Sequence, residues 1–250
     1  SLILTVQISS KLLPGGKEQE SSLVPRLLAS SGLQLFDVSE AKISIKAAGI
    51  NFPDILMVAG KYQHKPSLPF VPGFEIAGEI LEMGSNNQRF REGDHVMAHM
   101  RTGGYAEECV VPIGKIHALP KSFDFAQGAG FQVAYSTAYV SLVPRGHLVE
   151  GETLLVHGAT GGVGLAAVQL GRAVGAKVIA TVSNAKKIPA AKESGAEHVI
   201  LLGRAGFKDE VKDITSGRGA DVIYDPVGGN VFDESLRCIA WGGRLLVVGF

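Results

Sequence analysis

The segment of residues 153–183 constrains the fold of this chain more than any other, because a glycine-rich turn lies there between two short apolar runs. The first run, residues 154–156, is typical of a strand that is buried on both faces of a parallel sheet. Apolar residues then recur at three- and four-residue steps over residues 163–174, which predicts a helix that ends at Gly175. A second apolar run, residues 178–182, completes a strand, helix and strand unit.

The turn itself, Ala-Thr-Gly-Gly-Val-Gly at residues 159–164, resembles a phosphate-binding loop. Gly161, Gly162 and Gly164 can take backbone angles that a side chain would forbid, and they let a diphosphate approach the main chain closely. The helix that follows points its amino-terminal amides at the same diphosphate. Ala159 stands where the G-x-G-x-x-G pattern has its first glycine, so the alternative is a glycine-rich turn in another α/β protein without nucleotide. The strand before the turn and the helix after it favour the dinucleotide site.

The end of the second strand indicates which dinucleotide binds. A site that prefers NAD places an acidic residue about 20 residues beyond the glycines, where it holds the ribose 2′-hydroxyl. The corresponding position here is Ser183, followed by Asn184, Ala185, Lys186 and Lys187, and none of these is a carboxylate. A hydroxyl, an amide and two cations can hold a 2′-phosphate instead, so the sequence predicts NADPH as the cofactor. The alternative is that the two lysines are solvated charges at the start of a helix.

Composition and charge exclude several classes of partner. With 250 residues, 46% hydrophobic and 19% charged, the chain can bury a large core and is expected to form two domains. Its 24 basic and 24 acidic side chains balance, which argues against binding to nucleic acid or to an anionic membrane surface. Two cysteines without a pairing pattern, and no membrane-length apolar run, predict a cytoplasmic location, with a mitochondrial one as the alternative.

The periodicity of apolar residues changes near residue 123. Short strand-like segments between Gly- and Pro-rich turns predict a β-rich, barrel-like domain over residues 1–123, of which residues 1–35 receive no assignment. Residues 124–250 begin with an apolar helical stretch at 126–143 and then alternate strands with helices, which predicts a doubly wound parallel sheet. The strands are expected at residues 42–47, 74–83, 95–99 and 107–111, and then at 154–156, 178–182, 198–202, 221–225 and 244–248. The chain has no initiator Met and ends on an apolar strand, so both ends are expected to be incomplete.

Six ordered motifs carry a resemblance to a known family. They are Ala-Gly-Ile-Asn-Phe-Pro-Asp at residues 48–54, Gly-Lys-Tyr at 60–62, Leu-Pro-Phe-Val-Pro-Gly-Phe-Glu at 68–75, Ala-Gly at 77–78, Gly-Gly-Tyr-Ala-Glu at 103–107 and His-Gly-Ala-Thr-Gly-Gly-Val-Gly at 157–164. In these motifs the chain resembles the quinone oxidoreductase (zeta-crystallin-like) branch of the zinc-free medium-chain dehydrogenase/reductase superfamily. The resemblance implies a GroES-like β-rich domain followed by a Rossmann NADPH-binding domain, with the reaction in the cleft between them. It also implies a longer full-length chain that forms a homodimer or a tetramer.

The positions that bind zinc in related proteins hold other residues in this chain. Zinc-dependent members of the superfamily place a Cys where this chain has Asn51 and a His where it has Phe74, and they carry a further cluster of four cysteines. Neither an amide nor a phenyl ring replaces a thiolate or an imidazole as a zinc ligand. The seven histidines show no ligand spacing and are expected to be surface or packing residues. The sequence therefore predicts no catalytic or structural metal.

The implied reaction is transfer of a hydride from NADPH to a quinone or to an electron-poor alkene (an enone). Without zinc, hydrogen-bond donors must stabilise the negative charge that grows on the substrate oxygen. Asn51 and Tyr62 are the candidate catalytic residues, because the resemblance places both on loops that face the cleft, and Tyr62 could also return a proton. The alternatives are that Tyr62 only packs its ring under the proline-rich loop, and that Asp54 caps the helix after Pro53 rather than touching substrate.

For the cofactor, the resemblance implies three sets of contacts. Thr160, Gly161, Gly162 and Val163 lie at the diphosphate, Ser183 and Lys186 at the 2′-phosphate, and Val248, Gly249 and Phe250 beside the nicotinamide. The leading hypothesis is an NADPH-dependent quinone or enone reductase. A 2-enoyl-thioester reductase is the alternative enzyme, and a non-catalytic NADPH-binding structural or regulatory protein is the alternative from a different class.

Overall fold

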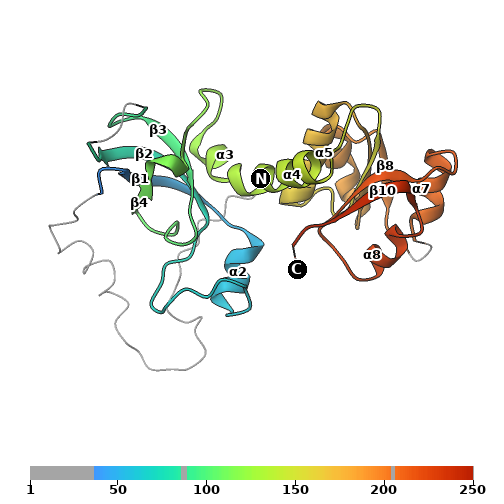
Figure 1. The fold of residues 1–250 in the computed structure, drawn as a ribbon, viewed down its shortest axis with the longest axis horizontal. Coiled ribbons are helices and arrows are strands. Elements are labelled where there is room, and N and C mark those ends of the chain that lie inside the picture. Colours follow the sequence, from blue (N-terminus) through green and yellow to red (C-terminus); the bar gives the residue numbers. More distant parts are fainter. Residues whose placement is uncertain (1–36, 86–88, 204–205, 250) are drawn as a thin grey trace. The chain divides into compact units, whose positions relative to one another are not determined.

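A computed structural model of the chain describes residues 37–85, 89–203 and 206–249, and these residues form two compact units (Figure 1). The first unit ends at Gly130 and the second begins at Phe131. The unassigned residues 1–35 lie outside the described residues, as does Phe250. Within the described ranges, no helix has both the length and the apolar character needed to cross a membrane.

The first unit is built on a five-stranded antiparallel sheet with the strand order β4-β1-β2-β3-β5. Its elements are β1 (Glu40–Gly49), α2 (Phe52–Val58), β2 (Glu75–Met83), β3 (His95–His99), β4 (Glu108–Pro112), the 3₁₀ turn η2 (Ile113–Lys115), β5 (Ile116–Ala118) and α3 (Phe125–Ala129). Ala41 and Ile43 of β1 point into one core, where they join Ile80, Val96 and Val111 from three other strands. This sheet confirms the expected β-rich domain. Only β5 is missing from the expected strands, since three residues are too few to display a period.

The second unit is a five-stranded parallel sheet with the strand order β10-β9-β6-β7-β8. Its strands are β6 (Thr153–Val156), β7 (Lys177–Val182), β8 (His198–Leu201), β9 (Ala220–Asp225) and β10 (Ile239–Val247). Its helices are α4 (Gln132–Val140), the π-helical η3 (Ser141–Arg145), α5 (Gly162–Val174), the 3₁₀ turn η4 (Ala185–Lys187), α6 (Ile188–Glu193), α7 (Lys208–Ile214) and α8 (Asn230–Ser235). The chain leaves β6 towards β7 on one side and returns to pair β9 on the other, so the topological switch point lies between β6 and β9. This order confirms the doubly wound Rossmann fold.

Both faces of the parallel sheet are covered, which explains why its strands are continuous apolar runs. Val156 packs into one core with Ala166 and Ala167 of α5. Leu155, its neighbour along the strand, packs into the opposite core with Phe207. The parallel sheet therefore separates two apolar layers, and the carboxyl ends of its strands meet at one edge.

The apolar stretch at 126–143, expected as one helix, is divided in two. The amide of Gly130 donates to the carbonyl oxygen of Ala126 (3.1 Å) and closes α3, and α4 begins at Gln132. Gly130 has a φ of −97° and a ψ of 8°, so this helix end does not depend on a left-handed residue. Along the sequence, the boundary between the two compact units falls at this break.

The last strand begins earlier than the expected residue 244. It pairs with β9 at Ile239 and again from Arg244, with an irregularity of register in between. Gly242 adopts a left-handed φ of 74° inside this irregular part. The glycines there hide the strand period, so only the second half of β10 could be predicted from the sequence.

Candidate cofactor and catalytic sites

The glycine loop connects β6 to α5, as expected. The glycine that takes a left-handed backbone angle is Gly158, which is not one of the three expected glycines. Gly158 adopts a left-handed φ of 57°, whereas Gly161, the N-cap of α5, has an ordinary φ of −79°. The expectation that Gly161, Gly162 and Gly164 supply forbidden backbone angles is therefore wrong. Gly158 supplies this angle, because the chain must turn sharply where it leaves the buried strand.

Gly162 and Gly164 are needed for space rather than for conformation. A Cβ on Gly164 would lie 2.2 Å from the carbonyl oxygen of Gly158, so this glycine lets α5 pack directly against the loop. A Cβ on Gly162 would meet no atom within 4 Å, so the first residue of α5 borders open space. An open surface at the amino terminus of a 13-residue helix fits a diphosphate, which the helix amides can bind.

The end of β7 presents exposed polar groups without a carboxylate. Thr181 and Val182 are buried, but Ser183 and the residues after it up to Lys187 are exposed. The side chain of Asn184 accepts a hydrogen bond from the amide of Lys186 (2.9 Å) and so begins the turn η4. Because β6 and β7 are neighbouring parallel strands, this turn lies at the same edge of the sheet as the glycine loop. The chemistry of these groups fits a 2′-phosphate.

The ends of β9 and β10 complete this edge. The amide of Val248 donates to the carbonyl oxygen of Asp225 (2.9 Å), which holds the residues after β10 beside the end of β9. A Cβ on Gly158 would lie 3.5 Å from the side chain of Val227, so the turn after β9 touches the glycine loop. Of the predicted cofactor residues, those that the structure describes are placed at the carboxyl ends of β6, β7 and β10: Thr160, Gly161, Gly162, Val163, Ser183, Lys186, Val248 and Gly249.

Two buried polar residues at this edge were not among the predicted site residues. One oxygen of Asp225 accepts from the amides of Val227 (2.9 Å) and Gly228 (3.0 Å) and shapes the turn after β9. The ring of His157 is fully buried, with Nδ1 3.0 Å from Thr181 Oγ1 and Nε2 2.9 Å from Ser235 Oγ. Burial lowers the pKa of His157 to about 4. Each of the two is a polar residue at the end of an apolar run, and His157 also begins the motif at residues 157–164.

In the first unit, a buried carboxylate orients the amide of Asn51. The Nδ2 atom of Asn51 donates to Oε1 of Glu75 at 2.8 Å, and Glu75 is only 2% exposed. A carboxylate can only accept, so this contact decides which end of the amide is the nitrogen. One N–H of Asn51 is thereby engaged, and no acceptor for the other is found among the residues that the structure describes.

Asp54 caps α2. Its carboxylate is 3% exposed and accepts from the amide of Asn51 (2.9 Å), the residue that precedes α2, and from the amide of Gly73 (3.0 Å). Burial raises the pKa of this carboxyl group. Asp54 thus ties the start of α2 to the end of the proline-rich loop.

Tyr62 follows α2 at the end opposite to Asn51. Its half-buried ring packs edge-on against Phe74, with centroids 5.7 Å apart, as the packing alternative requires. Among the described residues, its hydroxyl has no hydrogen-bond partner. Phe74 and Glu75 are neighbours at the start of β2, and each contacts one candidate catalytic residue: Phe74 contacts Tyr62, and Glu75 contacts Asn51.

The positions of the absent zinc ligands have no metal-binding surroundings. Among the residues outside the undescribed gaps, no group of three or more His, Cys, Asp and Glu side chains could hold a metal ion. The absence of zinc stays a prediction, which rests on the chemistry of Asn51 and Phe74.

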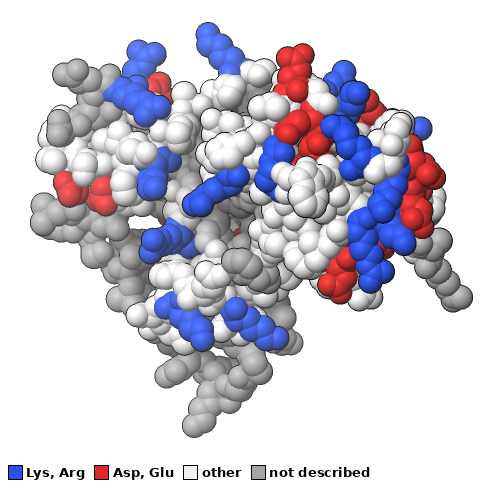
Figure 2. All heavy atoms as spheres, turned by 45° about the vertical axis from the view of Figure 1, so that its right-hand side comes forward, with Lys and Arg blue, Asp and Glu red and all other residues white. Residues whose placement is uncertain are grey.

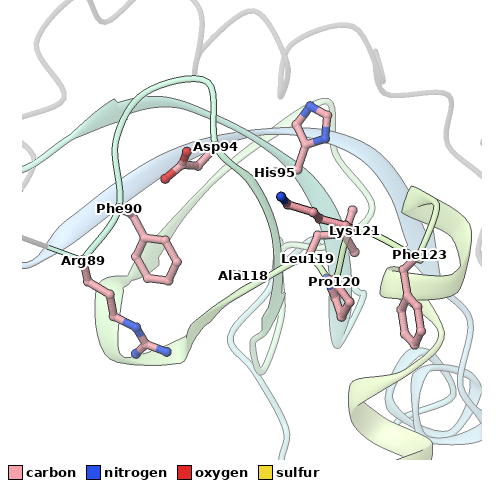
Figure 3. A pocket seen from close by; sticks show the side chains of 9 residues that line it. All are labelled: Arg89, Phe90, Asp94, His95, Ala118, Leu119, Pro120, Lys121 and Phe123. Atoms are coloured by element: carbon pink, nitrogen blue, oxygen red, sulfur yellow. The ribbon is translucent and has the colours of Figure 1, made fainter.

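A hollow of about 360 Å³ lies elsewhere in the first unit (Figure 3). Side chains from residues 89–95 and 118–123 line it, and Arg89 lies over the ring of Phe90 at 5.0 Å. None of the predicted site residues lines this hollow, so it does not belong to the proposed chemistry.

Comparison with known proteins identifies related chains for both units. Residues 37–150 match the family model of the alcohol dehydrogenase GroES-like domain, and residues 162–250 match that of the zinc-binding dehydrogenase. The chain is 45% identical to the quinone oxidoreductase-like protein 2 homolog of Nematostella vectensis, over 85% of its own length and 58% of that protein. The chain thus spans about three fifths of the length of the curated relatives it matches.

Solved structures agree with this match. The Escherichia coli quinone oxidoreductase complexed with NADPH superposes with a TM-score of 0.77 at 33% identity, over 85% of this chain and 68% of that one. The CurK enoyl reductase superposes with a TM-score of 0.79 at 28% identity, over 85% of this chain and 66% of that one.

A GroES-like unit followed by a doubly wound unit with a glycine loop defines a medium-chain dehydrogenase/reductase. The chain belongs to the quinone oxidoreductase branch of this superfamily, as the six sequence motifs indicate.

Proposed function

We propose that the chain is an NADPH-dependent oxidoreductase that transfers a hydride to a quinone or to an electron-poor alkene without zinc. The observation that carries this proposal is the exposed turn after β7, which offers hydroxyl, amide and ammonium groups and no carboxylate beside an open glycine loop. The NADPH complex of the Escherichia coli relative supports the choice of cofactor.

Three parts of the second unit would hold the cofactor. The amides of Thr160, Gly161, Gly162 and Val163 bind the diphosphate, Ser183 and Lys186 bind the 2′-phosphate, and Val248, Gly249 and Phe250 lie beside the nicotinamide. NADPH, when bound, supplies the hydride, and with it the two electrons of the reduction. The protein has to position this group and to exclude NADH, which lacks the 2′-phosphate.

Asn51 and Tyr62 would act on the substrate. The free N–H of Asn51, whose amide Glu75 holds in one orientation, donates to the substrate oxygen and stabilises the charge that develops there. The hydroxyl of Tyr62 gives the proton that completes the hydroquinone or the saturated product, and it regains a proton from solvent. The substrate gains one hydride and one proton in total.

Replacing Tyr62 by Phe tests the catalytic part of the proposal. The change keeps the ring contact with Phe74 and removes only the hydroxyl, so stability should stay the same. Loss of a positioned proton donor is expected to lower kcat by about 10²-fold or more. Unchanged turnover with a quinone would leave Tyr62 with a packing role only.

Assays of substrate turnover and of NADPH binding distinguish the proposal from its two alternatives, a 2-enoyl-thioester reductase and a non-catalytic NADPH-binding protein. The likeness to the CurK enoyl reductase favours a 2-enoyl thioester as the second candidate substrate. The experiment follows NADPH oxidation with a quinone, an enone and an enoyl thioester, and measures direct binding of NADPH in parallel. Turnover of the quinone or the enone supports the proposal, turnover of the thioester alone supports the alternative enzyme, and binding without turnover supports a structural or regulatory protein. Absence of NADPH binding contradicts all three.

The remaining proposals concern partners and location. We infer a small-molecule substrate, no nucleic-acid partner, a homodimer or tetramer for the full-length chain, and a cytoplasmic location. Size-exclusion chromatography with light scattering measures the oligomeric state of the 250-residue chain directly.

A further inference from the structure

We propose that His157 is a positioning residue for the cofactor, because its side chain ties the end of β6 to the end of β7 and so sets the spacing between the diphosphate loop and the 2′-phosphate site. This inference rests on the proposed NADPH function. It gives the buried His157 a role in the preference for NADPH over NADH, in addition to its role in packing.

The position of His157 makes this tie direct. His157 is the first residue after β6 and precedes Gly158 of the glycine loop. Its Nδ1 atom lies 3.0 Å from Oγ1 of Thr181, which is the last residue but one of β7. Ser183, proposed for the 2′-phosphate, follows two residues later. The ring therefore connects two segments of the chain. One is the glycine loop, which is proposed to bind the diphosphate of NADPH, and the other is the end of β7, which is proposed to bind its 2′-phosphate.

The protons of this network can be assigned from the contacts. The hydroxyl of Ser235 donates to the carbonyl oxygen of Val231 (2.7 Å), so its single proton is engaged. Ser235 must then accept from His157, which places the ring proton on Nε2. Nδ1 is left as an acceptor, and the hydroxyl of Thr181 donates to it. His157 is thus a neutral ring with a fixed tautomer and a fixed orientation.

Main-chain contacts support the same connection. The regular pairing of β6 with β7 ends at Val156 and Ala180, before the loop begins. Beyond that pair, the amide of Ala159 donates to the carbonyl oxygen of Thr181 (3.2 Å). The amide of His157 itself donates to the carbonyl oxygen of Tyr224 on β9 (3.0 Å). The backbone of His157 is therefore anchored on β9, while its side chain holds β7.

Removal of the Thr181 hydroxyl should shift the residues proposed for the 2′-phosphate, Ser183 and Lys186, and should leave the glycine loop in place. We therefore compare Thr181→Val, which keeps the shape of the side chain, with Thr181→Ser, which keeps the hydroxyl. Thr215→Val serves as a control away from the cofactor residues, because the Thr215 hydroxyl donates to the carbonyl oxygen of Val211 (2.8 Å) and accepts from the amide of Gly219 (2.9 Å). Melting temperature and the dissociation constants of NADPH and NADH are measured for each variant.

The decisive quantity is the ratio of the two dissociation constants. Thr181→Val is expected to reduce the preference for NADPH about fivefold, as for the loss of one hydrogen bond. Thr181→Ser should retain the preference, and Thr215→Val should lower only the melting temperature. If Thr181→Val destabilises the fold but weakens both cofactors equally, the positioning role is overturned and His157 is a structural residue.

A second measurement does not depend on the cofactor. Nitrogen NMR of the histidine rings in the unliganded chain should find the His157 proton on Nε2, and Ser235→Ala should perturb that signal. A proton on Nδ1 would overturn the proposal. A wild-type chain that binds NADPH and NADH equally, but has the Nε2 proton, contradicts the proposed cofactor preference and removes the selectivity role, while the tie between β6 and β7 stands.

Discussion

At the residue scale, the candidate catalytic amide depends on a neighbour that is distant in the sequence. Asn51 is recognisable because it stands where related proteins carry a zinc ligand. Glu75, which orients it, gives no such signal, because the two meet only through the pairing of Gly49 with Glu75 in β1 and β2. A Cβ on Gly49 would lie 2.5 Å from Oε1 of Glu75, so glycine makes room for the carboxylate.

Glu75→Gln tests whether this orientation matters. Glutamine can donate as well as accept, so the amide of Asn51 is no longer held in one orientation. We expect kcat for quinone reduction to fall about tenfold, which corresponds to about 1.4 kcal/mol. The dissociation constant of NADPH serves as the control and should not change. An unaltered kcat would show that Asn51 does not need Glu75.

The titration of His157 should make stability depend on pH. Its pKa is lowered to about 4 in the fold from an ordinary value of 6.5, since burial disfavours the charged ring. The unfolded chain therefore binds the proton first, and stability present above the ordinary pKa is lost as pH falls towards the folded value. The loss between pH 7 and pH 5 should be about 2 kcal/mol. Denaturant unfolding at both values measures it, and His157→Gln should remove this part of the difference; an equal slope in the variant contradicts the assignment.

At the element scale, the strand, loop and helix of residues 153–174 could be predicted almost completely, whereas the part each glycine plays could not. The sequence shows which residues of the loop are glycines. Only the packing of the folded chain decides that Gly158 takes the left-handed angle and that Gly164 touches the loop backbone. The break of α3 at Gly130 and the irregular start of β10 escape prediction for the same reason. A glycine leaves no trace in the apolar period, so its effect depends on its neighbours in space.

Gly164→Ala and Gly162→Ala form a matched pair for this distinction. A methyl group at residue 164 would lie 2.2 Å from the carbonyl oxygen of Gly158, so the first variant should lose about 1–3 kcal/mol of stability. A methyl group at residue 162 meets no atom within 4 Å, so the second variant should be as stable as the wild type or slightly more stable. Because it fills the proposed diphosphate cradle, the second variant should bind NADPH about tenfold more weakly. Equal stability of both variants would contradict the assigned packing.

At the scale of the whole molecule, the order of the two units could be predicted because the apolar period changes between them. Each unit has its own buried core, so each carries enough information for its own fold. Basic and acidic side chains are interspersed on the right-hand part of the face drawn in Figure 2, in keeping with the 24 charges of each sign. What the sequence cannot indicate is which charges far apart in the chain become partners.

Arg244 forms the contact that closes the second unit. Its guanidinium donates from Nη1 and Nη2 to the carboxylate of Glu152, each at 2.8 Å, and from Nε to the carbonyl oxygen of Gly146 (2.8 Å). These bonds join β10 to the segment that leads into β6, across 92 positions of the chain. The hydrogen bonds from Arg244 also lower the pKa of Glu152.

Arg244→Lys should therefore weaken the second unit as a whole. Lysine keeps the charge but cannot form the two-pronged contact, so we expect a loss of about 1–3 kcal/mol in the unfolding of this unit. Glu108→Gln is the control, because it breaks the more exposed pair with Lys42 in the first unit and should cost less than about 1 kcal/mol. Since the pKa of Glu152 is lowered in the fold, the advantage of Arg244 should be present at neutral pH and shrink as pH falls below the ordinary value of 4.5. Calorimetry of both variants measures these differences, and an Arg244→Lys chain as stable as the wild type would mean that β10 is held by packing alone.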